Sequence, residues 1–188
     1  MNFTTSKNKI VDSLNLLDLK KVDSCIKQLT EKILFSIENN GKVLICGNGG
    51  SAAEAEHFAA ELVCKFQKVR KGLPALTLHS NVPTITAIGN DLNFENIFSR
   101  NLEALGNKND VLITLSTSGN SQNVIKALKL AKEMKIYSFA LLGNDGGKMK
   151  LIPDDFFLVN SNTVSTIQEI HLMFLHALCA EIDSNDFV

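Results

Sequence analysis

Short apolar runs alternate with helical stretches from Lys42 to the C-terminus, and this order constrains the fold more than any other feature. The runs are rich in Val, Ile and Leu without strict polar alternation, which is typical of parallel strands covered on both faces. We expect strands at 42–46, 75–78, 84–88, 111–115, 137–142 and 155–158, and helices at 52–65, 94–105, 122–134 and 163–182. The sequence therefore predicts an α/β fold, a three-layer sandwich around a parallel sheet.

The N-terminal segment has a different pattern. Apolar residues recur there at three- and four-residue spacing, which predicts an amphipathic helix containing Val22, Ile26, Leu29, Ile33 and Ile37, preceded by a shorter one containing Ile10, Leu14 and Leu17. A minimal sandwich does not need these helices. We therefore divide the chain into a helical arm at 1–40 and a domain at 41–188. We expect the arm to pack in an oligomer, with a cover over its own domain as the alternative.

Composition excludes several classes of function. The 188 residues carry a net charge of −1, with 45% hydrophobic and 21% charged residues, which suits one globular domain and gives no basic field for nucleic acid. There is no signal sequence and no apolar stretch of about 18 residues, so we expect no membrane contact. Four scattered cysteines are interpreted as reduced thiols. These features predict a cytoplasmic protein.

The segment Gly47–Ser51 leads from the first domain strand into a helix. Its glycines let backbone N–H groups approach an anion, and the helix N-terminus adds a favourable dipole. The run formally matches a dinucleotide-binding fingerprint, but the next strand ends at His79 and Ser80, where an acidic ribose partner is expected. No Gly-Lys-Ser/Thr follows, so a P-loop is excluded. An anion site and a plain structural turn remain.

The helix after this loop carries His57 and Glu61. Residues four apart lie on one helix face, so an imidazole and a carboxylate are presented together. An acid/base pair beside an anion site indicates chemistry on a phosphorylated small molecule.

A second loop, Ser116–Ser121, has four hydroxyls and one glycine between a strand and a helix. Hydroxyl and backbone N–H groups can surround a phosphate without a lysine. An ordinary helix N-cap needs only one such residue. We therefore predict phosphate binding by this loop, with hydroxyls from Ser116, Thr117, Ser118 and Ser121.

The two loops, together with the segment 166–176 that contains Gln168 and His176, resemble the sugar isomerase (SIS) family. More narrowly, the chain resembles the bacterial phosphoheptose isomerases over nearly its whole length, including 89–100. The resemblance implies a parallel five-stranded, flavodoxin-like sheet preceded by N-terminal helices. It also implies a homo-oligomer, expected to be a tetramer with sites near subunit interfaces. The implied activity converts sedoheptulose 7-phosphate to D-glycero-D-manno-heptose 7-phosphate, for lipopolysaccharide or capsule.

The resemblance further implies roles for individual residues. Glu61 and His176 would be the catalytic base and acid. One zinc ion per site would be held by His57, Glu61, Gln168 and His176. Substrate contacts are expected from Asn48, Gly49, Gly50, Ser51, Asn90, Asp91, Ser116, Thr117, Ser118, Ser121 and Gln168.

The chemistry is consistent with these residue types. Aldose–ketose interconversion moves a proton between C1 and C2 through an enediolate, and one carboxylate can remove the proton and return it. Glu61 suits this role, while His176 or a bound metal can polarise the carbonyl oxygen. Metal ligation by Glu61 competes with its use as a base, and both roles stay open.

Other histidines and turns have simpler interpretations. His171 lies about 140° from His176 around an ideal helix, so we expect it at the solvent or an interface. His79 is interpreted as structural, and His176 by itself could be a core histidine. Asp91 is of a type that also forms turns. The segment 143–147 is expected to form a flexible turn over the site.

Two departures from the family pattern concern substrate contacts. Lys65 stands where related isomerases often carry an arginine, and an acidic residue expected near Ser165 is absent. The alternatives to an isomerase are a non-catalytic SIS protein that binds a replication initiator and a sugar-phosphate sensor. The presence of both Glu61 and His176 favours the isomerase.

Overall fold

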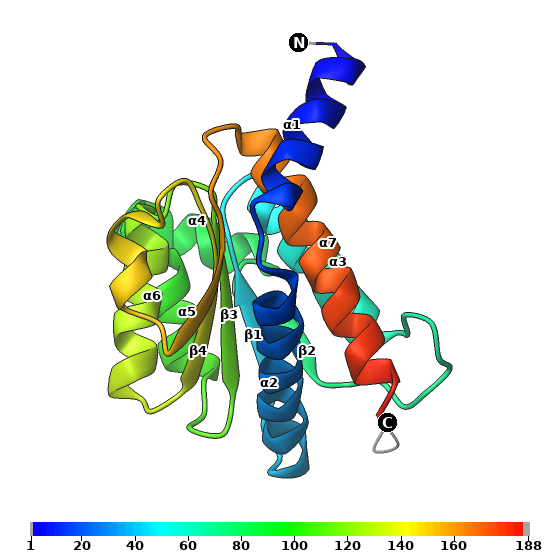
Figure 1. Cartoon of the computed structure of the whole chain (residues 1–188). Helices are drawn as coiled ribbons and strands as arrows, with labels where there is room; N and C mark the ends of the chain where they lie inside the picture. The colour runs from blue at the N-terminus through cyan, green and yellow to red at the C-terminus, as the bar shows by residue number, and fades with distance from the viewer. Residues whose placement is uncertain (1, 186–188) are drawn as a thin grey trace.

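The computed structural model describes residues 2–185. In this part of the chain the strands form a single sheet, and helices pack around it (Figure 1). The strands are β1 (Val43–Cys46), β2 (Ala75–Thr77), β3 (Val111–Ser116), β4 (Tyr137–Gly143) and β5 (Asp155–Val159). The α-helices are α1 (Phe3–Asn15), α2 (Leu19–Glu38), α3 (Gly50–Val63), α4 (Val82–Asp91), α5 (Ile97–Leu105), α6 (Gln122–Glu133) and α7 (Val164–Asp183). Two 3₁₀ turns complete the order, η1 (Phe94–Asn96) and η2 (Gly147–Leu151).

All five strands are parallel and lie in the order β2-β1-β3-β4-β5. Val43 of β1 pairs with Ala75 of β2 on one side and with Val111 of β3 on the other. The two strands that follow β1 in the chain, β2 and β3, thus lie on opposite sides of it. In open parallel sheets, ligands bind beyond the carboxyl ends of the strands at such a switch point. The loops that follow β1 and β3 lie there.

Helices cover both faces of the sheet, which confirms the three-layer sandwich. Side chains of α2, α3 and α7 pack on one face, and those of α4, α5 and α6 pack on the other (Figure 1). Strands β1 and β3 are buried along their whole length. Because both faces are covered, these strands read as continuous apolar runs in the sequence.

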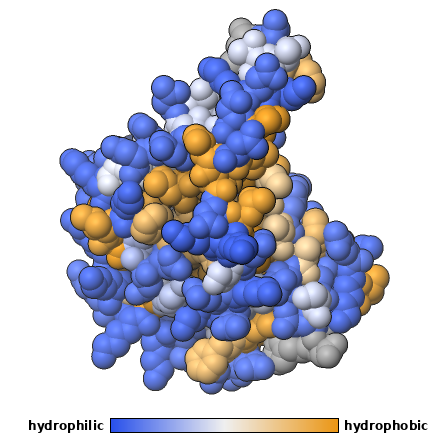
Figure 2. Space-filling model, in the orientation of Figure 1, coloured by the Kyte–Doolittle hydropathy of each residue, from blue (hydrophilic) through white to orange (hydrophobic). Residues whose placement is uncertain are grey.

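The two N-terminal helices differ in their surroundings. Helix α2 places Ile26, Leu29 and Ile33 in the core of its own chain. Helix α1 projects from the body and has no buried residue (Figure 1). Apolar surface gathers where α1 meets the body (Figure 2). Phe3 on α1 is 86% exposed.

One expected strand is wrong. Residues 84–88 lie in helix α4 rather than in the sheet. The Asn81 side chain accepts a hydrogen bond from the Thr84 backbone N–H and so caps this helix, and Pro83 lies in its first turn. Both features start helices. A five-residue apolar run by itself does not distinguish a strand from a helix.

Within residues 2–185, no helix combines the length and the apolar character that crossing a membrane requires.

Candidate functional site

The loop between β1 and α3 is a tight turn at the carboxyl edge of the sheet. Gly49 has a φ of 57°, a left-handed conformation that glycine adopts without strain. The backbone N–H of Ser51 donates to the Asn48 carbonyl at 3.0 Å, and a Cβ on Gly47 would collide with the Ser51 backbone. The turn therefore brings the N-terminus of α3 to the carboxyl edge of the sheet, where its dipole favours an anion.

The loop between β3 and α6 is organised by its own hydroxyls. Ser116 Oγ lies 3.2 Å from Ser121 Oγ and accepts a hydrogen bond from the Gly119 backbone N–H at 3.1 Å. Gly119 has a φ of 62°, and a Cβ there would collide with the Gly146 carbonyl. Ser121 precedes α6 as its N-cap residue. The hydroxyls thus cluster at a helix N-terminus, an arrangement that suits an anion.

A reciprocal pair of amides joins the two loops. Asn48 Nδ2 donates to Asn123 Oδ1 and Asn123 Nδ2 donates to Asn48 Oδ1, each at 2.9 Å. Asn123 is buried in the first turn of α6. Sequence reasoning missed Asn123, because nothing in the pattern pairs residues that lie 75 positions apart. The pair fixes the position of one loop relative to the other.

The segment 143–147 packs against the hydroxyl loop. The Met149 backbone N–H donates to the Gly119 carbonyl at 2.9 Å, and the Lys148 N–H donates to Asn120 Oδ1 at 3.2 Å. The expected turn is therefore adjacent to this loop. Its neighbour η2 helps to hold the loop backbone.

Asn90 and Asp91 lie at the exposed C-terminal end of α4. Asn90 Nδ2 donates to Asp91 Oδ1 at 2.8 Å. Within residues 2–185, neither side chain forms a hydrogen bond with the two loops. Their contact with a substrate stays a prediction.

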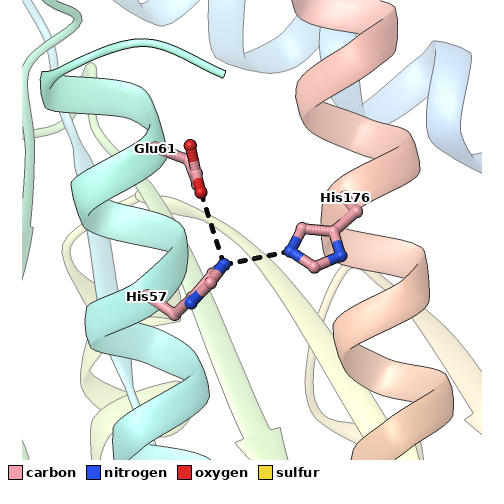
Figure 3. Close-up of side chains that lie close together, drawn as sticks. All are labelled: His57, Glu61 and His176. Carbon is pink, nitrogen blue, oxygen red and sulfur yellow. Dashed lines mark hydrogen bonds and ion pairs between the residues drawn. The ribbon is translucent and has the colours of Figure 1, made fainter. Parts of the chain in front are cut away.

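His57, Glu61 and His176 converge between helices α3 and α7 (Figure 3). His57 Nε2 lies 3.0 Å from His176 Nε2 and 3.4 Å from Glu61 Oε1. His57 and Glu61 lie on adjacent turns of α3, as their spacing predicts, and His176 enters from the facing side of α7. The ligand atoms of all three residues lie within 4.8 Å of one another. Residues 119 positions apart thus form one cluster.

Gln168 lies towards the other end of the contact between α3 and α7. Its side-chain amide packs against Gly50, where a Cβ would collide with Gln168 Nε2. Gly50 and His57 are seven residues apart, which is about 10 Å along a helix. Gln168 therefore lines the anion end of α3, and its expected role as a fourth metal ligand stays a prediction.

The expectation for His171 is wrong. His171 is fully buried, and its Nε2–H donates to the Leu142 carbonyl of β4 at 3.1 Å. Burial lowers the pKa of this imidazole to about 4, although the hydrogen bond to Leu142 acts in the opposite direction. Helix α7 contacts the sheet on one side and α3 on another, so two directions around it are covered. The side of α7 that lies about 140° from His176 therefore faces the sheet and not the solvent.

Two further titratable groups lie on or against the first turns of α3. Glu54 is buried, and desolvation raises its pKa to about 7. Sequence reasoning missed it because its burial depends on packing around α3. His79 Nε2 lies 3.3 Å from the Ala52 carbonyl, and burial lowers its pKa.

Comparison with known proteins identifies the family. The SIS domain model matches residues 10–143. A phosphoheptose isomerase of Helicobacter pylori is 48% identical over 161 residues, which are 86% of this chain and 84% of that protein. The chain belongs to the phosphoheptose isomerase family. Phosphoheptose isomerase 1 of Campylobacter jejuni is 47% identical over 160 residues, 85% of this chain and 86% of the relative.

Solved phosphoheptose isomerases share the whole architecture. The structure from Francisella tularensis superposes with a TM-score of 0.87 at 36% identity, and the one from Neisseria gonorrhoeae with 0.84 at 40% identity. Each comparison covers 97% of this chain and 95% of the other. The phosphoheptose isomerase fold therefore includes the N-terminal helices as well as the sheet.

Proposed function

We propose that this protein isomerises sedoheptulose 7-phosphate to D-glycero-D-manno-heptose 7-phosphate. The observation that carries the proposal is the convergence of Glu61 and His176 on His57, at 3.4 and 3.0 Å from its Nε2. Membership of the phosphoheptose isomerase family supports the choice of substrate. The enzyme would act in the cytoplasm, and its product would supply heptose for a surface polysaccharide.

Phosphate binding would take place at the two loops. The hydroxyls of Ser51, Ser116, Thr117, Ser118 and Ser121 and the N–H groups of Gly49 and Gly50 are the proposed donors. The N-termini of α3 and α6 add favourable dipoles there. The amide of Gln168 against Gly50 would contact the sugar near this end. Asn48 is the further sugar contact from the first loop, with Asn90 and Asp91 from α4.

The reactive carbons would lie at the other end of the substrate. C1 and C2 of a heptose 7-phosphate are remote from the phosphate, and His57 lies about 10 Å along α3 from Gly50. An extended sugar chain along the contact between α3 and α7 therefore reaches Glu61 and His176. This separation matches the length of the substrate to the spacing of the two halves of the site.

Glu61 is the proposed base and His176 the proposed acid. The Glu61 carboxylate removes a proton from one of C1 and C2 and returns it to the other on the same face of the enediolate. Its Oε1 is the atom that faces His57, which leaves Oε2 to move the proton. His176 would donate a proton to O2 as the C2 carbonyl is reduced to the enediol, and would take the O1 proton back as the C1 aldehyde forms.

The same cluster fits a divalent metal ion. Two imidazole Nε2 atoms and a carboxylate oxygen within 4.8 Å of one another are the ligand types that zinc takes. We propose that His57, Glu61 and His176 hold one zinc ion per site; Gln168, whose amide packs against Gly50, would have to turn towards this cluster to act as the expected fourth ligand. When bound by these atoms, such an ion would supply Lewis-acid polarisation of the substrate oxygens in place of proton donation by His176, and Glu61 would keep only its second oxygen for proton transfer.

We further propose that the protein is a homo-oligomer, a tetramer with sites near subunit interfaces. Helix α1 has no buried residue, and its apolar Phe3 and Val11 are exposed. Packing of this arm against another copy would cover these side chains.

The test is incubation with sedoheptulose 7-phosphate, first with zinc and then with a chelator, while the aldose product is followed by NMR. We expect turnover by the wild type and loss of turnover in Glu61→Gln. Glu56→Gln is the matched control, because Glu56 is an exposed glutamate on the same helix. Absence of product from the zinc-loaded wild type, alongside an active phosphoheptose isomerase, would rule out the proposal.

A further inference from the structure

The segment 64–74, which links α3 to β2, places an aromatic ring against His176. The rings of Phe66 and His176 are stacked, with centroids 5.6 Å apart and planes inclined by 14°. This geometry is within the range of favourable aromatic contacts. Phe66 also packs on the core beneath it. One face of the His176 imidazole is therefore covered by a ring whose own position is fixed.

The stack matters because His176 lacks the usual means of orientation. A histidine that binds a metal generally donates its second ring N–H to a carboxylate or carbonyl. In the part of the chain from 2 to 185, His176 has a polar contact through Nε2, to His57, and no hydrogen bond through Nδ1. The orientation of the ring thus depends on Phe66 and on the contact with His57, and not on a hydrogen bond through Nδ1.

The backbone beside Phe66 is held by the carboxylate of Asp183. The N–H groups of Gln67 and Lys68 donate to Asp183 Oδ2 at 2.8 and 2.9 Å. Asp183 ends α7, seven residues or about two turns beyond His176, so the two residues lie on the same side of that helix. The helix that carries the imidazole therefore also fixes the segment that covers it.

Arg70 extends this contact to α3. Its Nε donates to Asp183 Oδ1 at 2.8 Å, while Nη1 and Nη2 donate to the carbonyls of Leu62 and Glu61 at 2.8 and 3.1 Å. The Arg70 side chain is 0% exposed, and that of Asp183 is 5% exposed. Charge-assisted hydrogen bonds shielded from water in this way are strong and directional. One guanidinium thus joins the C-terminal turn of α3, at Glu61 itself, to the end of α7.

We propose that Phe66, Arg70 and Asp183, which we term the Asp183 clasp, are positioning residues for the His57–Glu61–His176 cluster. The clasp holds Phe66 on the His176 ring and fixes the separation of α3 and α7 where the cluster lies. It touches neither substrate nor metal. The catalytic importance of the clasp rests on the proposed function. The positioning of the cluster by the clasp does not.

The clasp acts at one end of the site, so its loss should separate two properties. We expect Phe66→Leu and Asp183→Asn to lower zinc affinity and kcat by about tenfold, the range typical of changes behind metal ligands. The KM for the sugar phosphate and the inhibition constant of inorganic phosphate should stay within about twofold, because the phosphate loops lie at the opposite end of α3.

Zinc affinity is measured by calorimetry on metal-free full-length protein, and the order of the His176 ring by NMR on the same samples. Phe66→Tyr keeps an aromatic ring, so its zinc affinity, kcat and ring order should match those of the wild type. Asp110→Asn is the matched control, because Asp110 is another buried carboxylate that accepts two backbone N–H groups and a cation, here Lys42. It lies at the start of β3, at the edge of the sheet away from the site, so it should lose stability without losing zinc affinity.

Wild-type zinc affinity and kcat in Phe66→Leu would overturn the inference, as would an equal loss of zinc affinity in Asp110→Asn. If Asp183→Asn fails to fold, the comparison of Phe66→Leu with Phe66→Tyr decides. Zinc affinity and ring order do not require turnover. A wild type that binds zinc but does not isomerise the heptose would refute the proposed function and leave the clasp standing.

Discussion

The surroundings of Glu54 predict how the stability of the protein depends on pH. It lies in the second turn of α3 with 8% of its surface exposed. Both carboxylate oxygens are buried, and neither has a hydrogen-bond partner among residues 2–185. Burial raises the pKa of this carboxyl from 4.5 to about 7; the nearby Ser51 hydroxyl acts in the opposite direction, and the charge of Glu169 adds to the rise.

This pKa sets the direction of a pH effect on stability. Between the two values the folded chain keeps a proton that the unfolded chain has released, so stability falls as pH rises through this window. The penalty is complete above the folded pKa. At 1.36 kcal/mol per unit, a rise from 4.5 to about 7 amounts to about 3 kcal/mol.

The perturbation is Glu54→Gln, and the assay is urea unfolding at about pH 5 and about pH 8 at one protein concentration. The amide does not ionise, so any loss from burying it is the same at both values of pH. We therefore expect the stability of the variant relative to the wild type to increase by about 2 to 3 kcal/mol between the two conditions. Both proteins contain His171, so its opposite pH dependence cancels in the difference.

Glu31→Gln, a change at an exposed glutamate on α2, should show a difference between the two conditions below about 0.5 kcal/mol. A stability difference between Glu54→Gln and the wild type that is the same at both values of pH would refute the reasoning. It would mean that Glu54 is ionised in the folded protein and has a partner.

Three other changes test the loops and the metal cluster. Asn123→Ala removes both hydrogen bonds to Asn48. We expect inorganic phosphate to inhibit this variant about tenfold less well, because a pair of hydrogen bonds worth about 1.4 kcal/mol no longer aligns the loops. Unchanged inhibition would contradict this. Gly119→Ala places a Cβ against the Gly146 carbonyl at a φ of 62°, and it should lower the melting temperature by several degrees in calorimetry, whereas an unchanged value would show that the loop adapts freely. Dialysis against a chelator should abolish turnover and zinc should restore it, with metal content measured alongside; full activity of metal-free protein would exclude a role for zinc.

The sequence predicted the sheet well, because burial on both faces leaves a clear record in the chain. The five strands that form were all expected, and only 84–88 was misassigned. At that position a capping asparagine and a proline outweigh the short apolar run. Local signals of this kind can be read from sequence once they are sought.

The site was predicted in part. His57 and Glu61 lie together because helix periodicity fixes their spacing, and His176 was placed with them through a family resemblance. Asn123 and Phe66 could not be found, because their partners lie far away along the chain and only the packing of α3, α6 and α7 brings them together. His171 was misplaced for a related reason, since one angle on one helix says nothing of the sheet on its other side.

The measurement that tests the central claim most directly is solvent-deuterium incorporation at C2 of the sugar phosphate, followed by NMR for the wild type and Glu61→Gln. A carboxylate that moves the proton through an enediolate exchanges it with solvent, so the wild type should incorporate deuterium. In Glu61→Gln, with Glu56→Gln behaving as wild type, incorporation should fall by at least about a hundredfold, the lower range for loss of a general base. Incorporation at the wild-type rate in Glu61→Gln would contradict the role of Glu61 as the base.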